Sequence, residues 1–158
     1  MTSSNKRTVH AEEMMPLILE RLSSGQKVCG LTFQGVSMRP MLREGMDTVE
    51  LTQLPEKLQK YDLPVYHGAN GKYVMHRIVA VKDSCYICLG DNTYHYEKVR
   101  PEQMVAVVSA FRRGEKRISV DDPAYRLYCR VWCAIYPVRR LLKRIEDKLR
   151  RCLRRLFK

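Results

Sequence analysis

The sequence contains no long apolar run. No segment approaches the roughly 20 consecutive apolar residues that a helix needs to cross a bilayer. The N-terminal residues lack the apolar core of a secretory signal peptide, and Glu12 and Glu13 lie where such a core would be needed. We therefore expect the chain to stay in the cytoplasm, with its six cysteines mostly as free thiols. The chain also lacks internal repeats and low-complexity segments, which excludes a repeat architecture.

Acidic residues are scarce in the last part of the chain. Residues 126–158 contain twelve Lys and Arg but only two Asp and Glu, whereas residues 1–125 contain 17 basic and 15 acidic residues. Most of the formal net charge of +12 therefore belongs to the tail, and the remainder is nearly neutral. We expect the tail, rather than the body, to meet an anionic partner.

The cysteines do not form a convincing metal motif. Cys85 and Cys88 have the spacing of a zinc half-site, but they lie in a predicted strand, where residues three apart point to opposite faces. No second ligand pair accompanies them in the sequence. We predict no metal site and no cofactor.

Short apolar segments separated by turn residues dominate the middle of the chain. The expected strands are residues 27–34, 48–51, 63–66, 72–81, 85–89, 105–111 and 117–120, and a short helix over 14–22 precedes them. This spacing predicts a mostly β fold, either a coiled antiparallel sheet or a small barrel. We divide the chain into an N-terminal segment with a short helix (1–24), a β-rich domain (25–120) and a helical tail (121–158).

The tail has the pattern of a basic amphipathic helix. Asp121, Asp122 and Pro123 suit a first helical turn, and apolar residues then recur at helical spacing opposite basic ones. Pro137 should kink or divide this helix.

Ser37 and His76 are the two residues that point to chemistry. Ser37 lies in a turn after an apolar strand, and His76 lies within the strand expected over 72–81. A serine becomes a nucleophile when a positioned base takes its proton, and histidine is a suitable base. Taken singly, each has a simpler interpretation, as a turn serine and a core histidine. Their neighbours in the sequence favour the catalytic one.

Three short segments resemble motifs of one peptidase family. Residues 35–40 (Gly-Val-Ser-Met-Arg-Pro) resemble the Gly-x-Ser-Met-x-Pro motif of type I signal peptidases. Residues 76–79 (His-Arg-Ile-Val) resemble the family's general-base segment, and residues 90–92 (Gly-Asp-Asn) resemble its third motif. The three occur in the family's order and near its spacing, and the resemblance covers residues 25–115.

The residue at the base position distinguishes two branches of this clan. Most bacterial signal peptidases and the self-cleaving SOS repressors have lysine there, whereas the subgroup of the endoplasmic reticulum, archaea and spore-forming bacteria has histidine. His76 makes this chain similar to the histidine subgroup. The resemblance implies a serine endopeptidase whose catalytic domain is the region 25–120. It also implies coiled antiparallel sheets, with the serine at the edge of a groove.

The roles of the residues follow from this resemblance. Ser37 would attack the scissile carbonyl, and His76 would take its proton and deliver it to the leaving amine. The backbone N–H of Ser37 is the best candidate for stabilising the oxyanion. An acidic residue should orient the imidazole. We place Asp91 in this role and keep Glu97, the first acidic residue after the Gly-Asp-Asn motif, as the alternative.

The chain departs from the family pattern in two respects. It has no membrane-spanning helix, and it differs from the family's two Gly-Asp segments: the one before the third strand reads Tyr61-Asp62 here, and the earlier one reads Gly45-Met46-Asp47. We therefore expect the substrate to be an extended segment of a precursor protein or peptide. Self-cleavage at Cys29-Gly30 is disfavoured, because this bond lies too close to Ser37 in the chain.

Two other classes of function compete with a peptidase. The first is a catalytically silent module of the same fold that docks a peptide or a membrane. The second is a nucleic-acid-associated regulator, which the absence of a helix-turn-helix pattern disfavours. Retention of both Ser37 and His76 favours the peptidase.

The tail has three possible partners, and the sequence ranks them. Residues 124–158 could lie on an anionic membrane surface, holding the protein at the inner face of the membrane. Alternatively, they could pack on the body or on a second copy. Binding to nucleic acid through phosphates is the least favoured, and the oligomeric state stays open.

Overall fold

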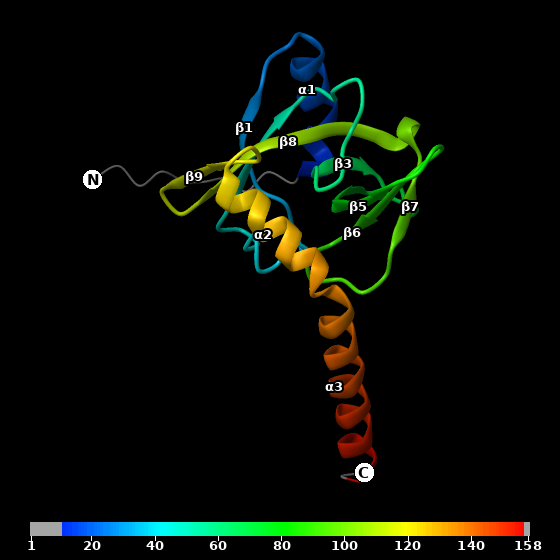
Figure 1. The fold of residues 1–158 in the computed structure, drawn as a ribbon. Coiled ribbons are helices and arrows are strands. Elements are labelled where there is room, and N and C mark those ends of the chain that lie inside the picture. The colour runs from blue at the N-terminus through cyan, green and yellow to red at the C-terminus, as the bar shows by residue number, and fades with distance from the viewer. Residues whose placement is uncertain (1–10, 157–158) are drawn as a thin grey trace, which may run out of the picture.

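The computed structural model describes residues 11–156 of the chain (Figure 1). The ends of the predicted N-terminal segment and tail, residues 1–10 and 157–158, lie outside this range. The strands are β1 (Val28–Leu31), β2 (Thr48–Thr52), β3 (Pro64–His67), β4 (Tyr73–Met75), β5 (Arg77–Val81), β6 (Tyr86–Leu89), β7 (Glu97–Val99), β8 (Met104–Arg113) and β9 (Lys116–Ser119). The helices are α1 (Ala11–Ser23), α2 (Pro123–Ala134), α3 (Tyr136–Leu156) and the short 3-10 helix η1 (Pro101–Gln103).

The strands form two antiparallel sheets. The larger sheet has the order β1-β2-β8-β3-β4, and β9 pairs with β8 outside this path. The smaller sheet has the order β5-β6-β7. The mostly β architecture with an N-terminal helix and C-terminal helices confirms the coarse prediction, whereas no closed barrel is found in the described part of the chain.

The strand predicted over 72–81 is divided between the two sheets. β4 ends at Met75, which lies opposite Val65 of β3, and β5 starts at Arg77, which lies opposite Leu89 of β6. The expectation of one continuous strand was therefore wrong. β4 pairs with β3 in the larger sheet, and β5 pairs with β6 in the smaller one, so the chain passes from one sheet to the other at His76.

Tyr61 lies close to this change of sheet and has a strained backbone. Its φ is 82°, and its N–H donates to the carbonyl of Ile78 over 2.8 Å. A left-handed conformation costs a residue with a side chain about 1–2 kcal/mol. Glycine, which the resembled Gly-Asp segment has at this position, would adopt this conformation without strain.

Helices at both ends of the described chain contribute to one core against the larger sheet. Met15, Ile18 and Leu22 of α1 are buried, as are Tyr125 and Cys129 of α2. A second, smaller cluster fills the smaller sheet and its boundary with β8; it consists of Leu58, Tyr66, Ile78, Cys88, Val99, Met104 and Val107. Met38, Leu42, Val49 and Met75 of the larger cluster also line the cavity described below.

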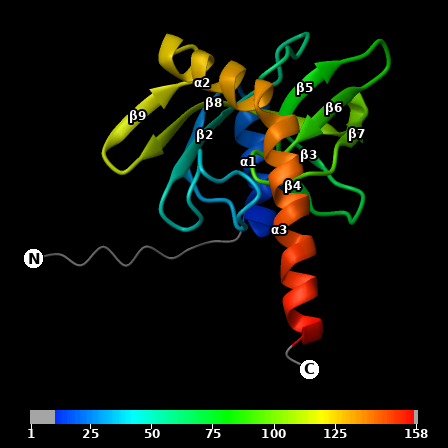
Figure 2. The same ribbon diagram turned by 60° about the horizontal axis from the view of Figure 1, so that its bottom comes forward.

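The predicted helical tail forms two helices, which confirms the expected division near Pro137. The Asp122 carboxylate accepts hydrogen bonds from the N–H groups of Ala124 and Tyr125, and Pro123 occupies the first turn of α2. The break falls at Ile135. Helix α2 lies on the body, whereas α3 projects away from it (Figures 1 and 2). Between residues 11 and 156, no helix is both long and apolar enough to cross a membrane.

Candidate active site

Ser37 lies in the loop between β1 and β2, residues 32–47, which we call the serine loop. The carboxylates of Glu44 and Asp47 hold this loop in place. Gly35 adopts a φ of 96°, and its N–H donates to the Glu44 carboxylate over 2.7 Å. At the end of the loop, the Arg43 guanidinium donates to both oxygens of Asp47, at 2.7 and 3.1 Å. Burial alone would raise the pKa of Asp47, but the hydrogen bonds from Arg43 lower it below its ordinary value. The loop is thus fixed at both ends, with Ser37 between them.

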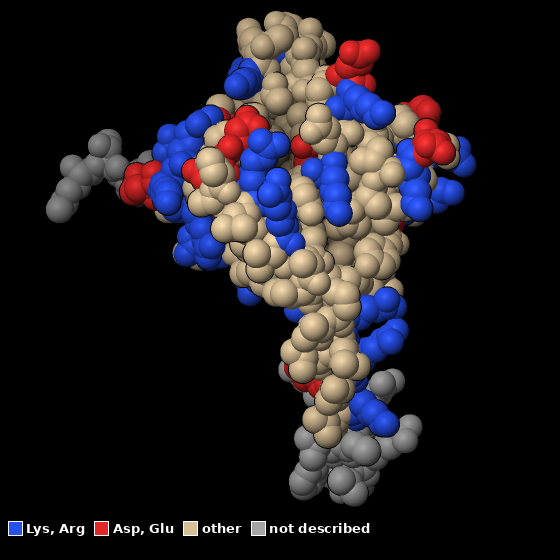
Figure 3. All heavy atoms as spheres, viewed as in Figure 1, with Lys and Arg blue, Asp and Glu red and all other residues tan. Residues whose placement is uncertain are grey.

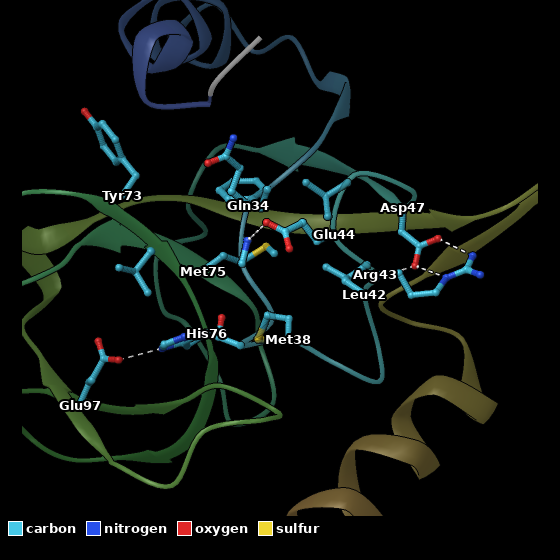
Figure 4. A pocket seen from close by; sticks show the side chains of 15 residues that line it. Gln34, Met38, Leu42, Arg43, Glu44, Asp47, Tyr73, Met75, His76 and Glu97 are labelled. Carbon is cyan, nitrogen blue, oxygen red and sulfur yellow. Dashed lines mark hydrogen bonds and ion pairs between the residues drawn. The ribbon is translucent and has the colours of Figure 1, made fainter. Parts of the chain in front are cut away.

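The buried His76 ring is oriented by Glu97, from β7. His76 Nδ1 lies 2.9 Å from Glu97 Oε1 (Figure 4). Because an ionised carboxylate only accepts hydrogen bonds, the proton between these atoms belongs to Nδ1. This hydrogen bond holds the pKa of Glu97 below its ordinary value. In a neutral imidazole held in this way, the second nitrogen, Nε2, is the acceptor.

Tyr66 completes this arrangement from the buried side. Its hydroxyl donates to Glu97 Oε2 over 2.8 Å, and its oxygen lies 3.1 Å from His76 Nδ1. Burial raises the pKa of Tyr66 well above its ordinary value, so the phenol stays protonated and remains a donor. The carboxylate therefore has a donor on each oxygen.

His76 Nε2 and the turn that contains Ser37 (residues 35–40, the serine turn) both lie next to Gly90. A β-carbon added at Gly90 would lie 2.9 Å from His76 Nε2 and 2.8 Å from the Ser37 carbonyl oxygen. Real β-carbons do not approach other atoms so closely, so a glycine at this position lets the histidine and the serine turn pack together. Ser37 and His76 line the same cavity, and the Ser37 carbonyl oxygen and His76 Nε2 both lie close to Gly90.

Asn92 fastens the serine turn to the loop after β6. Its backbone N–H donates to the Ser37 carbonyl over 2.7 Å, and its side-chain amide donates to the Val36 carbonyl over 3.2 Å. Gly90 and Asn92 therefore have complementary roles: one permits the close approach of the serine turn, and the other holds it there.

The structure contradicts the placement of Asp91 beside the imidazole. Both Asp91 oxygens accept hydrogen bonds from Arg77, at 2.9 and 2.8 Å, and Tyr128 donates a further one. The side chains of Arg77 and Asp91 are 0% and 1% exposed. Burial alone would lower the pKa of Arg77, but Asp91 raises it well above its ordinary value. Asp91 is thus engaged by a buried cation, and the alternative residue, Glu97, contacts the histidine.

Arg77 also connects the site to the rest of the fold. It donates to the Tyr125 hydroxyl over 2.8 Å and contacts the sulfur atoms of Cys129 and Met41. These partners come from α2 and from the serine loop. The guanidinium is therefore a structural centre on which the serine loop, β5, the loop after β6 and α2 converge.

A cavity of about 250 Å³ opens beside Ser37, His76 and Glu97. Its apolar walls come from the segments around β1, β2 and β4 and consist of Phe33, Met38, Leu42, Val49, Tyr73, Val74 and Met75 (Figure 4). A site of this kind can hold an apolar side chain of a ligand next to the Ser37–His76 pair.

The main-chain N–H of Ser37 is available to a ligand. Among residues 11–156 neither this N–H nor the Ser37 hydroxyl is engaged in a hydrogen bond. A free N–H beside a nucleophilic serine is what an oxyanion would require. Hydrogen bonds between nucleophile and base commonly tighten only when a substrate binds.

The candidate site contains no obvious ligand set for a metal. No group of three or more His, Cys, Asp or Glu side chains is arranged to hold an ion within the described residues. Cys85 and Cys88 are both buried, and burial raises the pKa of Cys88 to about 12, which keeps its thiol protonated.

Sequence reasoning missed the role of Tyr66 and did not anticipate β7. The only available signal for Glu97 was its position as the first acidic residue after Gly-Asp-Asn, and no signal pointed to Tyr66. Comparisons with protein-family models, curated proteins and solved structures found no significant match to this chain.

Proposed function

We propose that this chain is a serine endopeptidase, with Ser37 as the nucleophile, His76 as the general base and Glu97 as the residue that orients the base. The observation that carries this proposal is the orientation of the imidazole. Glu97 holds Nδ1 at 2.9 Å, and Nε2 faces the serine turn across Gly90. In serine activation by histidine, a carboxylate holds one ring nitrogen so that the other can take the serine proton, and this orientation of the His76 ring supports that role.

The reaction has two acyl-transfer steps. Ser37 Oγ attacks the scissile carbonyl while His76 Nε2 takes its proton, and the same proton then passes to the leaving amine. In the second step, a water molecule gives its proton to Nε2 and attacks the acyl ester, which releases the acid and restores the serine. The Ser37 N–H stabilises the oxyanion in both steps, and Glu97 stabilises the transient imidazolium.

The sheet edges beside the site favour an extended peptide as the substrate. The larger sheet begins at β1 and ends at β4, and residues of β4 and of the segment after β1 line the cavity. An extended peptide can add to such an edge through main-chain hydrogen bonds, while its side chains enter apolar pockets. The resemblance of residues 35–40, 76–79 and 90–92 to signal peptidase motifs supports the same substrate class, an extended segment of a precursor.

The proposal is tested with peptides that copy export signals and leader segments of precursors. The wild-type protein and Ser37→Ala are incubated with the same library, and products are identified by mass spectrometry. Ser84→Ala, which changes an exposed turn serine, is the matched control. We expect cleavage by the wild type and by the control, and a loss of about 10³-fold or more in Ser37→Ala.

Two outcomes would contradict the proposal. Cleavage that survives Ser37→Ala would assign the activity to another residue. Peptide binding by the wild type without any cleavage would identify the chain as a silent docking module of the same fold.

A further inference from the structure

Helix α3 carries an apolar stripe that the body does not cover. Val138, Leu141, Leu142, Ile145 and Leu149 follow helical spacing, and each is between 49 and 60% exposed. We call these five residues the α3 stripe. Helix α2 differs, because Tyr125 and Cys129 are buried against the body. Helix α2 also exposes Leu127 and Val131, at 61 and 50%. The α3 stripe is the longer apolar surface, and it lies on the helix that projects away from the body (Figures 1 and 2).

Basic residues accompany this stripe. The sequence of α3 contains nine Lys and Arg but only two acidic residues. Figure 3 shows basic side chains gathered along one side of α3, next to a face without them. A helix with an apolar face, many basic residues and low overall hydrophobicity has the pattern of helices that lie in the interface of a bilayer.

We propose that α3 docks on an anionic phospholipid surface, with the α3 stripe inserted at the headgroup level and the basic residues paired with lipid phosphates and carboxylates. Charge complementarity favours this occupant over a second copy of the chain. Two α3 helices packed stripe to stripe would bring two strongly basic segments together, whereas anionic lipid neutralises them. The inference does not depend on the proposed peptidase activity.

The base of α3 is fixed to the loop that holds the serine turn. Trp132 Nε1 donates to the Asp91 carbonyl over 3.1 Å, and Arg139, in the first turns of α3, donates to the same oxygen. The Arg139 guanidinium also stacks 3.8 Å from the centre of the Trp132 ring. The Tyr136 hydroxyl donates to the Tyr94 carbonyl over 3.0 Å. The start of α3 is thus held against the body near the candidate site.

The serine loop lies on the same side as part of the stripe. A shallow hollow of about 650 Å³ is lined by Arg39 and Pro40 of the serine loop and by Arg139, Leu142 and Lys143 of α3. A bilayer that receives Leu142 therefore approaches the segment that follows Ser37. Docking through α3 would hold the site close to the lipid surface.

The test is flotation of the full chain with vesicles of phosphatidylcholine alone or of phosphatidylcholine mixed with phosphatidylserine. We expect binding to the mixed vesicles that weakens as salt is added, and little binding to the neutral ones. The double variant Leu141→Glu with Ile145→Glu should bind about tenfold more weakly or worse, because it removes two inserted apolar side chains. Leu17→Glu, at an exposed leucine of α1, is the matched control and should bind like the wild type. Circular dichroism checks that all variants are folded.

Three outcomes would overturn the docking proposal. The first is equal binding of the wild type and the double variant to the mixed vesicles. The second is an absence of vesicle binding together with a dimer that the double variant dissociates, which would make a second copy the occupant. The third is an absence of vesicle binding together with salt-sensitive binding to duplex DNA, which would make nucleic acid the partner. Peptide cleavage is measured separately, so a failure of docking is distinguishable from a failure of the peptidase proposal.

Discussion

His76 and Arg77 are neighbours in the sequence, yet their side chains serve different regions of the molecule. His76 lines the cavity beside Ser37, and its carboxylate partner, Glu97, is 38% exposed. Arg77 lies inside the protein, and its carboxylate partner, Asp91, is 1% exposed. A carboxylate that lines an accessible cavity can orient a reacting group, whereas a carboxylate buried against a guanidinium stabilises the fold. The two pairs separate the roles that the sequence could not assign between Asp91 and Glu97.

The largest expected effect is on the buried pair. Asp91→Asn should lower the free energy of unfolding by about 3–5 kcal/mol, because it leaves the Arg77 charge buried without a counterion. The matched control is Glu50→Gln, since Arg117 also binds Glu50 through two hydrogen bonds, at 2.8 and 2.7 Å. Glu50 is only 10% exposed but Arg117 is 47% exposed, so water reaches the charge that Glu50→Gln leaves behind, and this change should cost less than Asp91→Asn. Urea unfolding measures both, and equal losses would contradict a structural role for the buried pair.

A smaller effect is expected where the two regions meet, at Gly90. Gly90→Ala places a methyl group within 2.9 Å of His76 Nε2 and the Ser37 carbonyl oxygen, which should cost about 1–3 kcal/mol of stability and reduce peptide cleavage. Gly68→Ala is the control, because its methyl group would be crowded by Val74 in a hairpin turn instead. Unfolding and cleavage assays on both variants check this. A Gly90→Ala protein with unchanged cleavage would show that the close approach is not needed.

Acid should weaken the contribution of the His76–Glu97 pair to the free energy of unfolding. The folded protein holds the pKa of Glu97 below its ordinary value of 4.5. The stabilisation that Glu97 provides is therefore fully present above about pH 4.5 and is lost as the pH falls through the lowered folded-state pKa. The difference in unfolding free energy between the wild type and Glu97→Gln should shrink as the pH falls from about 6 to about 3. A difference that grows on acidification would have the wrong sign for this account.

The smallest expected effect is that of Tyr66, which contacts both His76 and Glu97. Tyr66→Phe removes the hydrogen bond to Glu97 but leaves the contact between Glu97 and His76. We therefore expect a loss of about 1 kcal/mol or less in transition-state stabilisation, which is up to about fivefold in rate. Tyr86→Phe is the control, since Tyr86 packs against the same small cluster. Values of kcat/KM report the result, and an equal effect of both changes would remove Tyr66 from the positioning of His76.

Much of this arrangement could be predicted from local sequence. Short motifs around Ser37 and His76 pointed to both residues, and Pro137 indicated the break between the two tail helices. These features depend on neighbours in the chain, so a single sequence contains the information. The spacing of short apolar segments likewise indicated a mostly β fold.

The remainder depends on contacts between distant segments. The alternation over 72–81 is uninterrupted, so no local signal shows that the chain changes sheet at His76. β7 has only three residues, too few for a recognisable pattern. Asp91 was placed beside the imidazole because nothing local shows that Arg77 is buried and must be neutralised. The assignment of the two carboxylates needed the three-dimensional structure.

The most direct measurement of the central claim is the kcat/KM of Glu97→Gln relative to that of Asp91→Asn, each corrected for its folded fraction at the assay temperature. The account predicts that Glu97→Gln loses about 10²-fold or more per folded molecule, because His76, the proposed general base, loses its orienting carboxylate. It predicts that folded Asp91→Asn stays within about tenfold of the wild type, because its defect lies in stability. The reverse order, with Asp91→Asn the slower enzyme per folded molecule, would contradict the assignment of Glu97 to catalysis and Asp91 to the fold.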